Sequence, residues 1–330
     1  MPTIKLIDFS SCPLSNKNGL YAGQAGRKDG IVYRGENWMV KYPKSTKDMD
    51  RVPVPYTTSP LNEFVGSHIY EILGYDVHQT LLGIRNGKLV VACKDFETDN
   101  LRLMELRTIK NHANPELSEI LDRDFNSTGE QHFVNFDELF LHLQHNSILT
   151  EVKGLEERFW DMCTIDLLIG NGDRNNGNWG IVRNIRTGED RPAPIFDNGG
   201  CFTDKADDAK YRRLLDPKTA KASALNFRSS FGREMEPGNP DSLKQMNALG
   251  FVEYAMKFEG FRASVIKNIP LIEARILQMK ELINSIPESD LGLTIIWPAQ
   301  RDYFNTMLQL RLDLLLKPVY ERLVNDGRSI

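Results

Sequence analysis

The sequence of 330 residues predicts an α+β fold in two lobes: a small lobe of mostly antiparallel strands with one helix, and a larger helical lobe. Residues 1–97 contain short apolar runs typical of strands and a single well-delimited helix. Residues 98–330 show mainly helical spacing of apolar side chains. A polar loop rich in Asn and Asp follows one of these helices and leads into a hairpin.

The first elements are a glycine-rich segment and a strand that carries a lysine. Residues 19–28 include Gly23 and Gly26, whose backbone N–H groups can approach phosphates closely, and Lys28 adds positive charge. The strand at residues 37–43 places Lys41 among apolar neighbours. Kinases use a lysine on such a strand to bind the α- and β-phosphates of ATP. Taken alone, the glycine-rich segment could be a flexible turn and Lys41 a solvated strand lysine. The kinase interpretation depends on the position of the glycine-rich segment just before the lysine strand.

A helix is predicted from Ser59-Pro60 to Leu73, with Ser59 as its N-cap and Gly74 at its end. Apolar residues recur every four positions and form its core stripe. Glu63 lies off this stripe in the first turns and is the expected partner of Lys41, with Glu71 as the second candidate.

Two further strands, residues 77–84 and 88–93, are joined by Asn86-Gly87, a tight hairpin signal. The second strand continues into Lys94, Asp95 and Phe96. A kinase connects its lobes at this point and offers backbone groups to adenine. The position therefore predicts a nucleotide site at residues 93–96, that is, at Cys93, Lys94, Asp95 and Phe96.

The polar loop holds the most specific pattern. Asp173 is followed five residues later by Asn178, and a predicted hairpin of strands 179–182 and 193–196 leads to Asp197. In phosphoryl transfer an acid at the first position faces the acceptor hydroxyl, while the Asn and the second acid hold Mg²⁺. Asn and Asp also dominate ordinary turns, but the second acid at the end of a strand favours a kinase site.

Together these motifs resemble the HipA-like serine/threonine kinases over about residues 15–205, in particular their short type. The resemblance implies a protein-kinase-like fold with ATP in the cleft between the lobes, and a serine or threonine hydroxyl of a protein as acceptor. It implies that Lys41 contacts phosphates, that Asp173 is catalytic, and that Asn178 and Asp197 bind Mg²⁺. The sequence has no room for the extra amino-terminal subdomain of full-length toxins. It also lacks their Ser-x-Ser-Gly loop before Lys41, so an antitoxin partner has no support in the sequence.

Two alternatives stay open. Phosphoinositide kinases share the Asp-Arg-x-x-x-Asn pattern followed by Asp, and a lipid or small-molecule kinase could use the same fold. A lipid kinase should carry an apolar or basic membrane-facing element beside the cleft, and the sequence shows no convincing one. A non-catalytic ATP-binding module is the other alternative, against which the joint presence of Lys41, Asp173, Asn178 and Asp197 argues.

Composition limits the partners and the compartment. A net charge of −4 gives no basic face for nucleic acid. The four dispersed cysteines form no metal-binding pair, and the six histidines have no ligand spacing, so surface or half-buried positions are expected for the histidines. No signal peptide and no apolar run of membrane-spanning length is visible. A cytoplasmic location is the default expectation, and a non-classical secretion route would leave no mark in the sequence.

Three helices are expected late in the chain, at residues 242–258, 270–285 and 298–324, the last interrupted or kinked at Pro318. Residues 202–236 are expected to be irregular, where an activation-like segment would lie. Autophosphorylation is a further hypothesis: a phosphate on Thr57, Thr58 or Ser59 would compete with Glu63 for Lys41.

Overall fold

The computed structural model describes residues 3–21, 27–112, 114–124, 133–236 and 238–327. The chain divides into two compact units. The first unit comprises residues 1–96, 194–224 and 270–313, and the second comprises residues 97–193, 225–269 and 314–330. The first unit thus includes residues 1–96, together with two later segments that the sequence analysis assigned to the helical lobe.

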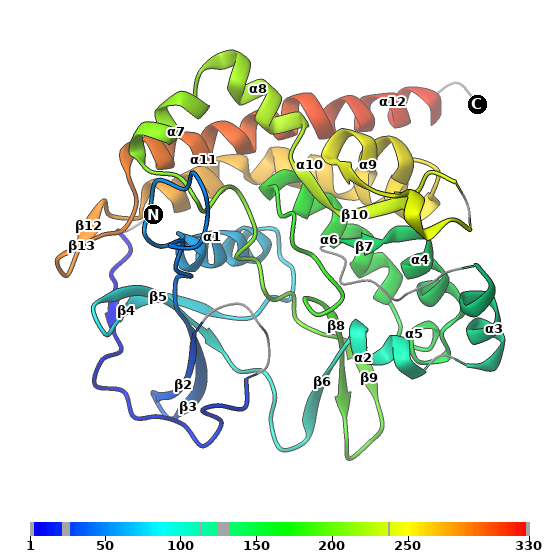
Figure 1. The fold of residues 1–330 in the computed structure, drawn as a ribbon, viewed down its shortest axis with the longest axis horizontal. Helices are drawn as coiled ribbons and strands as arrows, with labels where there is room; N and C mark the ends of the chain where they lie inside the picture. The colour runs from blue at the N-terminus through cyan, green and yellow to red at the C-terminus, as the bar shows by residue number, and fades with distance from the viewer. Residues whose placement is uncertain (1–2, 22–26, 113, 125–132, 237, 328–330) are drawn as a thin grey trace. The chain divides into compact units, whose positions relative to one another are not determined.

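The first unit contains a five-stranded sheet with the strand order β1-β4-β5-β3-β2. β1 pairs in parallel with β4, and the other three pairs are antiparallel, so the prediction of a mostly antiparallel sheet is confirmed. Asn86 and Gly87 have φ of 52° and 68°, as a two-residue hairpin requires. The strands in Figure 1 are β1 (Ile7–Asp8), β2 (Lys28–Tyr33), β3 (Glu36–Lys41), β4 (Thr80–Arg85) and β5 (Lys88–Lys94).

Helix α1 (Ser59–Ile72) packs against β4 and β5. The predicted capping role of Ser59 is wrong: Thr58 holds the N-cap position without a side-chain capping bond, and the Ser59 hydroxyl pairs with Thr57 Oγ1 at 2.9 Å. The sheet has its own apolar core, which fixes the strands that flank Lys41. Its members are Phe9, Ile31, Trp38, Val40, Tyr42, Val90 and Ala92.

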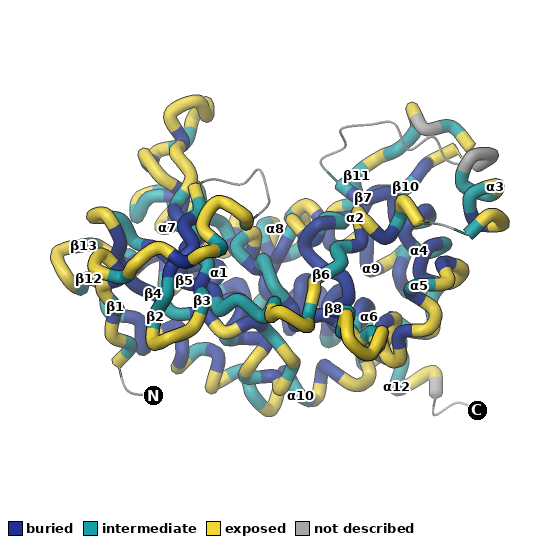
Figure 2. Tube along the Cα trace, turned by 90° about the horizontal axis from the view of Figure 1, so that it is seen from below, coloured by how far each residue is buried: buried dark blue, intermediate teal, exposed yellow. Residues whose placement is uncertain are grey.

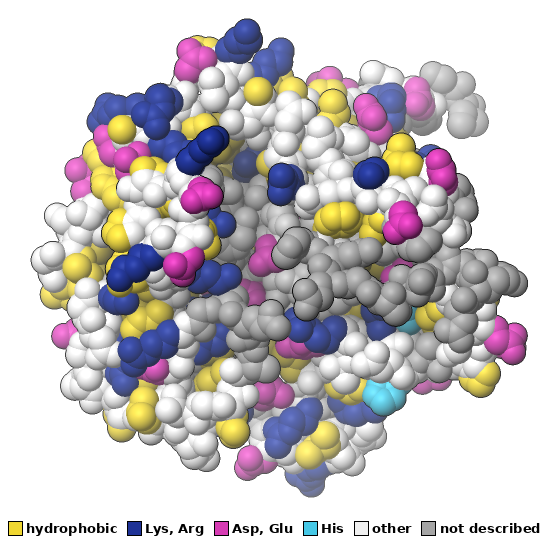
Figure 3. Space-filling model, viewed as in Figure 1, with side chains coloured by type: hydrophobic (Ala, Val, Ile, Leu, Met, Phe, Trp, Pro, Cys, Tyr) yellow, Lys and Arg dark blue, Asp and Glu magenta, His cyan; other side chains and the backbone are white. Residues whose placement is uncertain are grey.

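The remaining elements of the first unit come from later in the sequence. α7 (Asp208–Leu214) packs on α11 (Pro298–Arg311), with α8 (Pro217–Leu225) following α7 in the chain. Exposed basic side chains gather over α7 and α8 at the upper left of Figure 3, namely Arg212, Arg213, Lys218 and Lys221. A short hairpin of β12 (Ser289–Asp290) and β13 (Leu293–Thr294) has an exposed turn, drawn in yellow in Figure 2.

The second unit contains two three-stranded sheets, β6-β8-β9 and β11-β10-β7. An aromatic cluster around Phe136 packs beneath the second sheet, with Phe231 and Phe251 at 5.4 and 5.7 Å between ring centroids. The strands are β6 (Leu101–Glu105), β7 (Val134–Asn135), β8 (Gly180–Asn184), β9 (Asp190–Pro192), β10 (Arg228–Glu234) and β11 (Leu243–Asn247). The helices are α2 (Leu106–Ile109), α3 (Pro115–Asp124), α4 (Phe136–His145), α5 (Ser147–Thr150), α6 (Leu155–Ile169), α9 (Ala248–Ala255) and α12 (Lys317–Gly327).

Several predicted elements differ from the observed ones. The returning strand of the hairpin is β9, not residues 193–196, because Pro194 has no N–H with which to continue the ladder. Residues 202–236 are not irregular but form α7, α8 and β10. The first part of the predicted helix 242–258 is β11, and Asn247 caps α9 by accepting from Gly250 N.

Two proline predictions also have clear outcomes. Helix α10 (Glu259–Asn284) begins well before Pro270, which lies inside it, so the predicted start at Pro270 is wrong. The last predicted helix is interrupted, but before Pro318: a π-helical turn at Leu312–Leu316 separates α11 from α12, and Pro318 lies in the first turn of α12. Among the residues that the structure describes, no helix combines the length and apolarity needed to cross a membrane.

Candidate active site

In the first unit, Lys41 lies at the end of β3 and holds two carboxylates. Its Nζ is 2.9 Å from Glu63 Oε2 and 2.9 Å from Asp197 Oδ1. Glu63 comes from α1, while Asp197 follows the segment in which Ile195 pairs with Val77. Three segments far apart in the sequence therefore converge on one ammonium group, and Glu63 rather than Glu71 is the partner of Lys41.

Glu63 is surrounded by donors. Its side chain is 2% exposed. Oε2 accepts from Lys41 Nζ and from the backbone N–H of Gly199 at 3.0 Å. Oε1 accepts from the backbone N–H of Asn198 at 2.9 Å and lies 3.0 Å from His78 Nε2. A buried carboxylate with four donors is fixed in orientation and stays ionised.

The pKa values of the pair follow from these contacts. Burial alone would raise the pKa of Glu63, but the Lys41 ammonium and the His78 hydrogen bond hold it well below its usual range. Burial likewise opposes the charge on Lys41, yet Asp197 and Glu63 together raise the pKa of Lys41 well above its ordinary value. Both groups are therefore charged at neutral pH.

Asp197 adopts an unusual backbone conformation. Its φ of 58° lies in the left-handed region, which Asp tolerates better than bulky residues and which often marks functional positions. The next turn comes very close to α1: a Cβ added at Gly199 would meet Glu63 Oε2 at 3.1 Å. Glycine at position 199 thus allows the backbone N–H to reach the carboxylate.

In the second unit, the polar loop begins where α6 ends at Gly170, in left-handed conformation with φ of 65°. Asn178 Nδ2 donates to the Asp173 carbonyl at 2.6 Å, which closes the loop on itself. Asn175 Nδ2 donates to Asp173 Oδ1 at 3.0 Å, and Asp173 N donates to Asn171 Oδ1 at 3.1 Å. The loop therefore holds both sequence-predicted residues, Asp173 and Asn178, in one connected network.

The anchor of this loop is Arg174, which the sequence analysis missed. Its side chain is 1% exposed and donates to both oxygens of Asp166 on α6, at 2.8 and 3.0 Å. A third bond, at 2.9 Å, reaches the Asn178 carbonyl. Asp166 lies in α6, eight residues before Arg174. The two side chains meet only because the loop after Gly170 folds back along α6. The available signal was Asp166, an acid within the mostly apolar last two turns of α6.

The predicted nucleotide-binding residues have varied positions. Gly23 and Gly26 lie outside the described residues. Lys28 is directly opposite Lys41 in the β2–β3 register. Cys93 is buried on β5 opposite Met39, and Lys94 pairs with Glu36 at 2.7 Å. The other two residues are tied within the first unit: Asp95 accepts from Lys17 Nζ at 2.7 Å, and the Phe96 ring is 5.8 Å from that of Phe196.

Two histidines are more buried than the sequence analysis expected. His78 is 5% exposed and His142 is 1% exposed. His78 contacts Glu63 as described above, whereas His142 in α4 lies 3.3 Å from Asn146 Nδ2. Burial lowers the pKa of His142 to about 4. The spacing of histidines along the chain contained no indication that His78 faces the Lys41–Glu63 pair.

The cysteines are unpaired, as expected. Cys93, Cys163 and Cys201 are buried, and Cys12 is half-buried. Burial raises the pKa of the Cys93 and Cys163 thiols above the ordinary range.

A strand lysine held by a helix glutamate, on a small antiparallel sheet with one helix, defines the protein-kinase-like fold class. Comparison with known proteins gives the same class. The chain is 30% identical over 325 residues to the serine/threonine-protein kinase CtkA of Helicobacter pylori strain J99, covering 98% of this chain and 90% of that protein. The chain therefore belongs to the family of serine/threonine-protein kinases that includes CtkA, the short type of HipA-like kinase that the motifs resemble.

Solved structures extend the comparison. The crystal structure of the proinflammatory kinase CtkA of Helicobacter pylori matches with a TM-score of 0.79 and 27% identity, covering 98% of this chain and 99% of that one. A HipA toxin from Shewanella oneidensis in complex with HipB and operator DNA matches with a TM-score of 0.49 and 14% identity, covering 92% of this chain and 69% of that one. No protein-family model matches the chain.

Proposed function

We propose that the protein is an ATP- and Mg²⁺-dependent kinase that transfers the γ-phosphoryl group to a serine or threonine hydroxyl of a protein. The observation that carries this proposal is the Lys41 ammonium, held 2.9 Å from both Glu63 and Asp197. A lysine so fixed is ready to bind phosphate oxygens, because Glu63 orients it and keeps it charged.

The residues proposed to hold Mg²⁺ fit a hard cation. Mg²⁺ prefers carboxylate and carbonyl oxygens. The Asp197 carboxylate is 37% exposed and already binds a cation, the Lys41 ammonium. Asn178 donates with Nδ2, which leaves Oδ1 as its ligand atom. When bound, Mg²⁺ would neutralise charge that develops on the phosphate oxygens.

The protein's own groups perform the rest of the reaction. Lys41 would bind the α- and β-phosphates, and Asp173 would orient the acceptor hydroxyl and accept its proton. The hydroxyl oxygen forms the new bond to the γ-phosphorus, the bond from that phosphorus to the β–γ bridging oxygen breaks, and ADP leaves. Lys94 and Asp95 are engaged in ion pairs through their side chains, so any role of residues 93–96 toward adenine would use backbone groups.

The test is transfer of radiolabelled phosphate from ATP with Mg²⁺ to a bacterial lysate, followed by mapping of the modified residues. Label on serine or threonine that is absent with Asp173→Asn is the expected result. A parallel reaction with phosphoinositide vesicles tests the lipid-kinase alternative. Label in the vesicles and none in protein would overturn the proposed acceptor, and no label in either would favour a non-catalytic module.

The proposal includes autophosphorylation at Thr57, Thr58 or Ser59. Thr57 is 4% exposed and its hydroxyl bonds to that of Ser59, while Thr58 accepts from Gln300 Nε2 at 3.3 Å. These bonds would have to open before phosphate could be added. Mass spectrometry of the protein after incubation with ATP tests the three positions directly, and unmodified residues beside a phosphorylated substrate would exclude them.

A further inference from the structure

His78 has no place in the predicted kinase motifs, yet it contacts the Lys41–Glu63 pair. It lies in the connection between α1 and β4, and its side chain is 3% exposed. Nε2 is 3.0 Å from Glu63 Oε1. Because an ionised carboxylate only accepts hydrogen bonds, Nε2 carries the proton in this contact.

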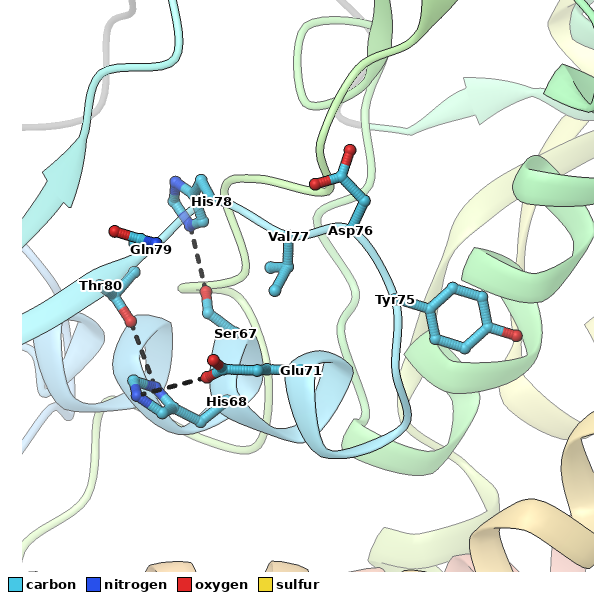
Figure 4. Close-up of a pocket in the computed structure, with 9 residues that line it drawn as sticks. All are labelled: Ser67, His68, Glu71, Tyr75, Asp76, Val77, His78, Gln79 and Thr80. Carbon is cyan, nitrogen blue, oxygen red and sulfur yellow. Dashed lines mark hydrogen bonds and ion pairs between the residues drawn. The ribbon is translucent and has the colours of Figure 1, made fainter.

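The contact continues into a network. His78 Nε2 is also 3.1 Å from Ser67 Oγ on α1, a contact drawn in Figure 4. Ser67 Oγ in turn accepts from Asn198 Nδ2 at 3.0 Å, and the Asn198 backbone N–H donates to Glu63 Oε1. The network closes a ring that joins α1, the connection 73–79 and the residue after Asp197.

The backbone of the same residue reaches the other carboxylate. His78 N donates to the Ile195 carbonyl at 3.0 Å, and Ile195 N donates to the Asp76 carbonyl at 2.9 Å. These two bonds fix the chain two residues before Asp197. His78 therefore touches both arms of the arrangement that holds Lys41: Glu63 through its ring and the Asp197 segment through its N–H.

The two oxygens of Glu63 have separate partners. Oε1 takes His78 and Asn198, and Oε2 takes Lys41 and Gly199. Without His78, Oε1 would keep a single donor and the carboxylate could rotate away from Lys41. We propose that His78 is a positioning residue, which keeps Glu63 Oε2 directed at Lys41. The inference rests on the proposed role of Lys41 in binding ATP.

A small cavity beside His78 allows the proposal to be tested by chemical rescue. It has a volume of about 150 Å³ and is lined by residues of α1 and of the segment that contains His78. Figure 4 shows the His78 ring at its edge with His68 and Glu71 across from it. The Glu71 side chain is 67% exposed, so the cavity reaches the surface. Free imidazole could therefore enter from solvent and occupy the space left by a truncated His78.

The experiment compares His78→Ala and His78→Gln with the wild-type protein. We expect kcat/KM for ATP to fall about tenfold or more in His78→Ala, as for the loss of a hydrogen bond to a charged group. KM for the acceptor should not change. Added imidazole should restore part of the activity, and His78→Gln, which keeps a donor, should retain most of it. His142→Ala is the matched control, because it also removes a buried histidine but imidazole should not affect it.

A second measurement does not depend on phosphoryl transfer. Acetylation of Lys41 by acetic anhydride, followed by peptide mass spectrometry, should be faster in His78→Ala than in the wild type, while exposed Lys218 reacts equally in both. Wild-type acetylation and wild-type kcat/KM in His78→Ala would overturn the proposal. A loss that neither imidazole nor glutamine reverses would assign His78 a structural role only. Absence of transfer by the wild type would refute the proposed function, and the acetylation rates would still decide the role of His78.

Discussion

Each of the two units contains a cation that is paired with carboxylate, and the two arrangements differ in accessibility. In the first unit, the Lys41 side chain is 15% exposed and one of its partners, Asp197, is 37% exposed. In the second unit, Arg174 and Asp166 are 1% and 8% exposed, and the arginine uses three donor bonds within the protein.

This difference separates a group that can exchange partners from one that cannot. Lysine is a compact charge on a flexible stem, whereas the arginine fork matches a carboxylate at two points and is fixed by it. In the proposed function, Lys41 takes phosphate oxygens in place of Asp197 while Glu63 still holds it. Arg174 has no such freedom and serves to shape the loop that carries Asp173 and Asn178. The comparison predicts that substitutions in the first arrangement act on activity and those in the second act on stability.

The largest effect is expected for Asp197→Ala. Loss of a proposed metal ligand should lower phosphoryl transfer by about 10³-fold or more and abolish Mg²⁺-dependent nucleotide binding. The melting temperature should change little, because the carboxylate is partly solvated. Transfer assays and calorimetry with ATP check both points, with exposed Asp302→Ala as the control. If Asp197→Ala lowered the melting temperature but kept normal phosphoryl transfer per folded molecule, the Lys41 arrangement would act on stability and not on activity.

Asp173→Asn should separate the chemical step from binding. The substitution removes the proposed base but keeps the size of the side chain and an oxygen that can accept from Asn175 Nδ2. Phosphoryl transfer should therefore fall by about 10²-fold or more. ATP and Mg²⁺ should bind as in the wild type, as measured by calorimetry. Equal loss of ATP binding in Asp173→Asn and Asp197→Ala would show that the two acids do not have the distinct roles proposed.

Arg174→Met should act mainly on stability. The substitution leaves the Asp166 carboxylate buried without its cation, which costs about 3–5 kcal/mol of unfolding free energy. Arg183→Met is the matched control, since its pair with Asp190 is 38% and 15% exposed and should contribute only about 0–1 kcal/mol. Urea denaturation measures both. Similar losses for the two variants would contradict the assignment of Arg174 as the anchor of the loop.

The smallest effect is a pH dependence of the Lys41–Glu63 pair. Because the folded pKa of Glu63 is lowered, its stabilisation is complete above the unfolded value of about 4.3 and is lost as the pH falls below it. Because the pKa of Lys41 is raised, its contribution persists up to at least about pH 10. The difference in unfolding free energy between wild type and Glu63→Gln should therefore be constant from about pH 5 to 9 and shrink below about pH 4. If the difference in unfolding free energy between wild type and Glu63→Gln grew as the pH fell, the lowered pKa of Glu63 would be contradicted.

Much of the first unit could be predicted from the sequence because its signals are local. Asn86-Gly87 specifies a hairpin, and the four-residue spacing of apolar residues identifies α1 as a buried helix. Glu63 was preferred to Glu71 because it lies off the apolar stripe in the first turns of the helix. His78 could not be found in this way, since its contact with Glu63 depends on how the connection after α1 returns along the residues before Asp197.

In the second half of the chain, local signals conflicted with long-range pairing. Residues 243–247 have apolar spacing compatible with a helix but pair with β10, and their end at Asn247 is where α9 begins. Pro270 resembles a helix start, although helix α10 continues through it from Glu259. The pair of Asp166 and Arg174 depends on a turn at Gly170 that the sequence indicates but whose direction it does not specify.

The uneven burial of the cysteines has a practical consequence. Thiol reagents attack the thiolate at accessible sites, so the buried thiols of Cys93, Cys163 and Cys201 should react slowly in the native protein. Cys12 is half-buried and packs at the margin of the sheet core that flanks Lys41. A maleimide fluorophore should therefore attach first at Cys12 in the unsubstituted protein. It would provide a single optical probe at the margin of the five-stranded sheet for following ligand titrations in real time.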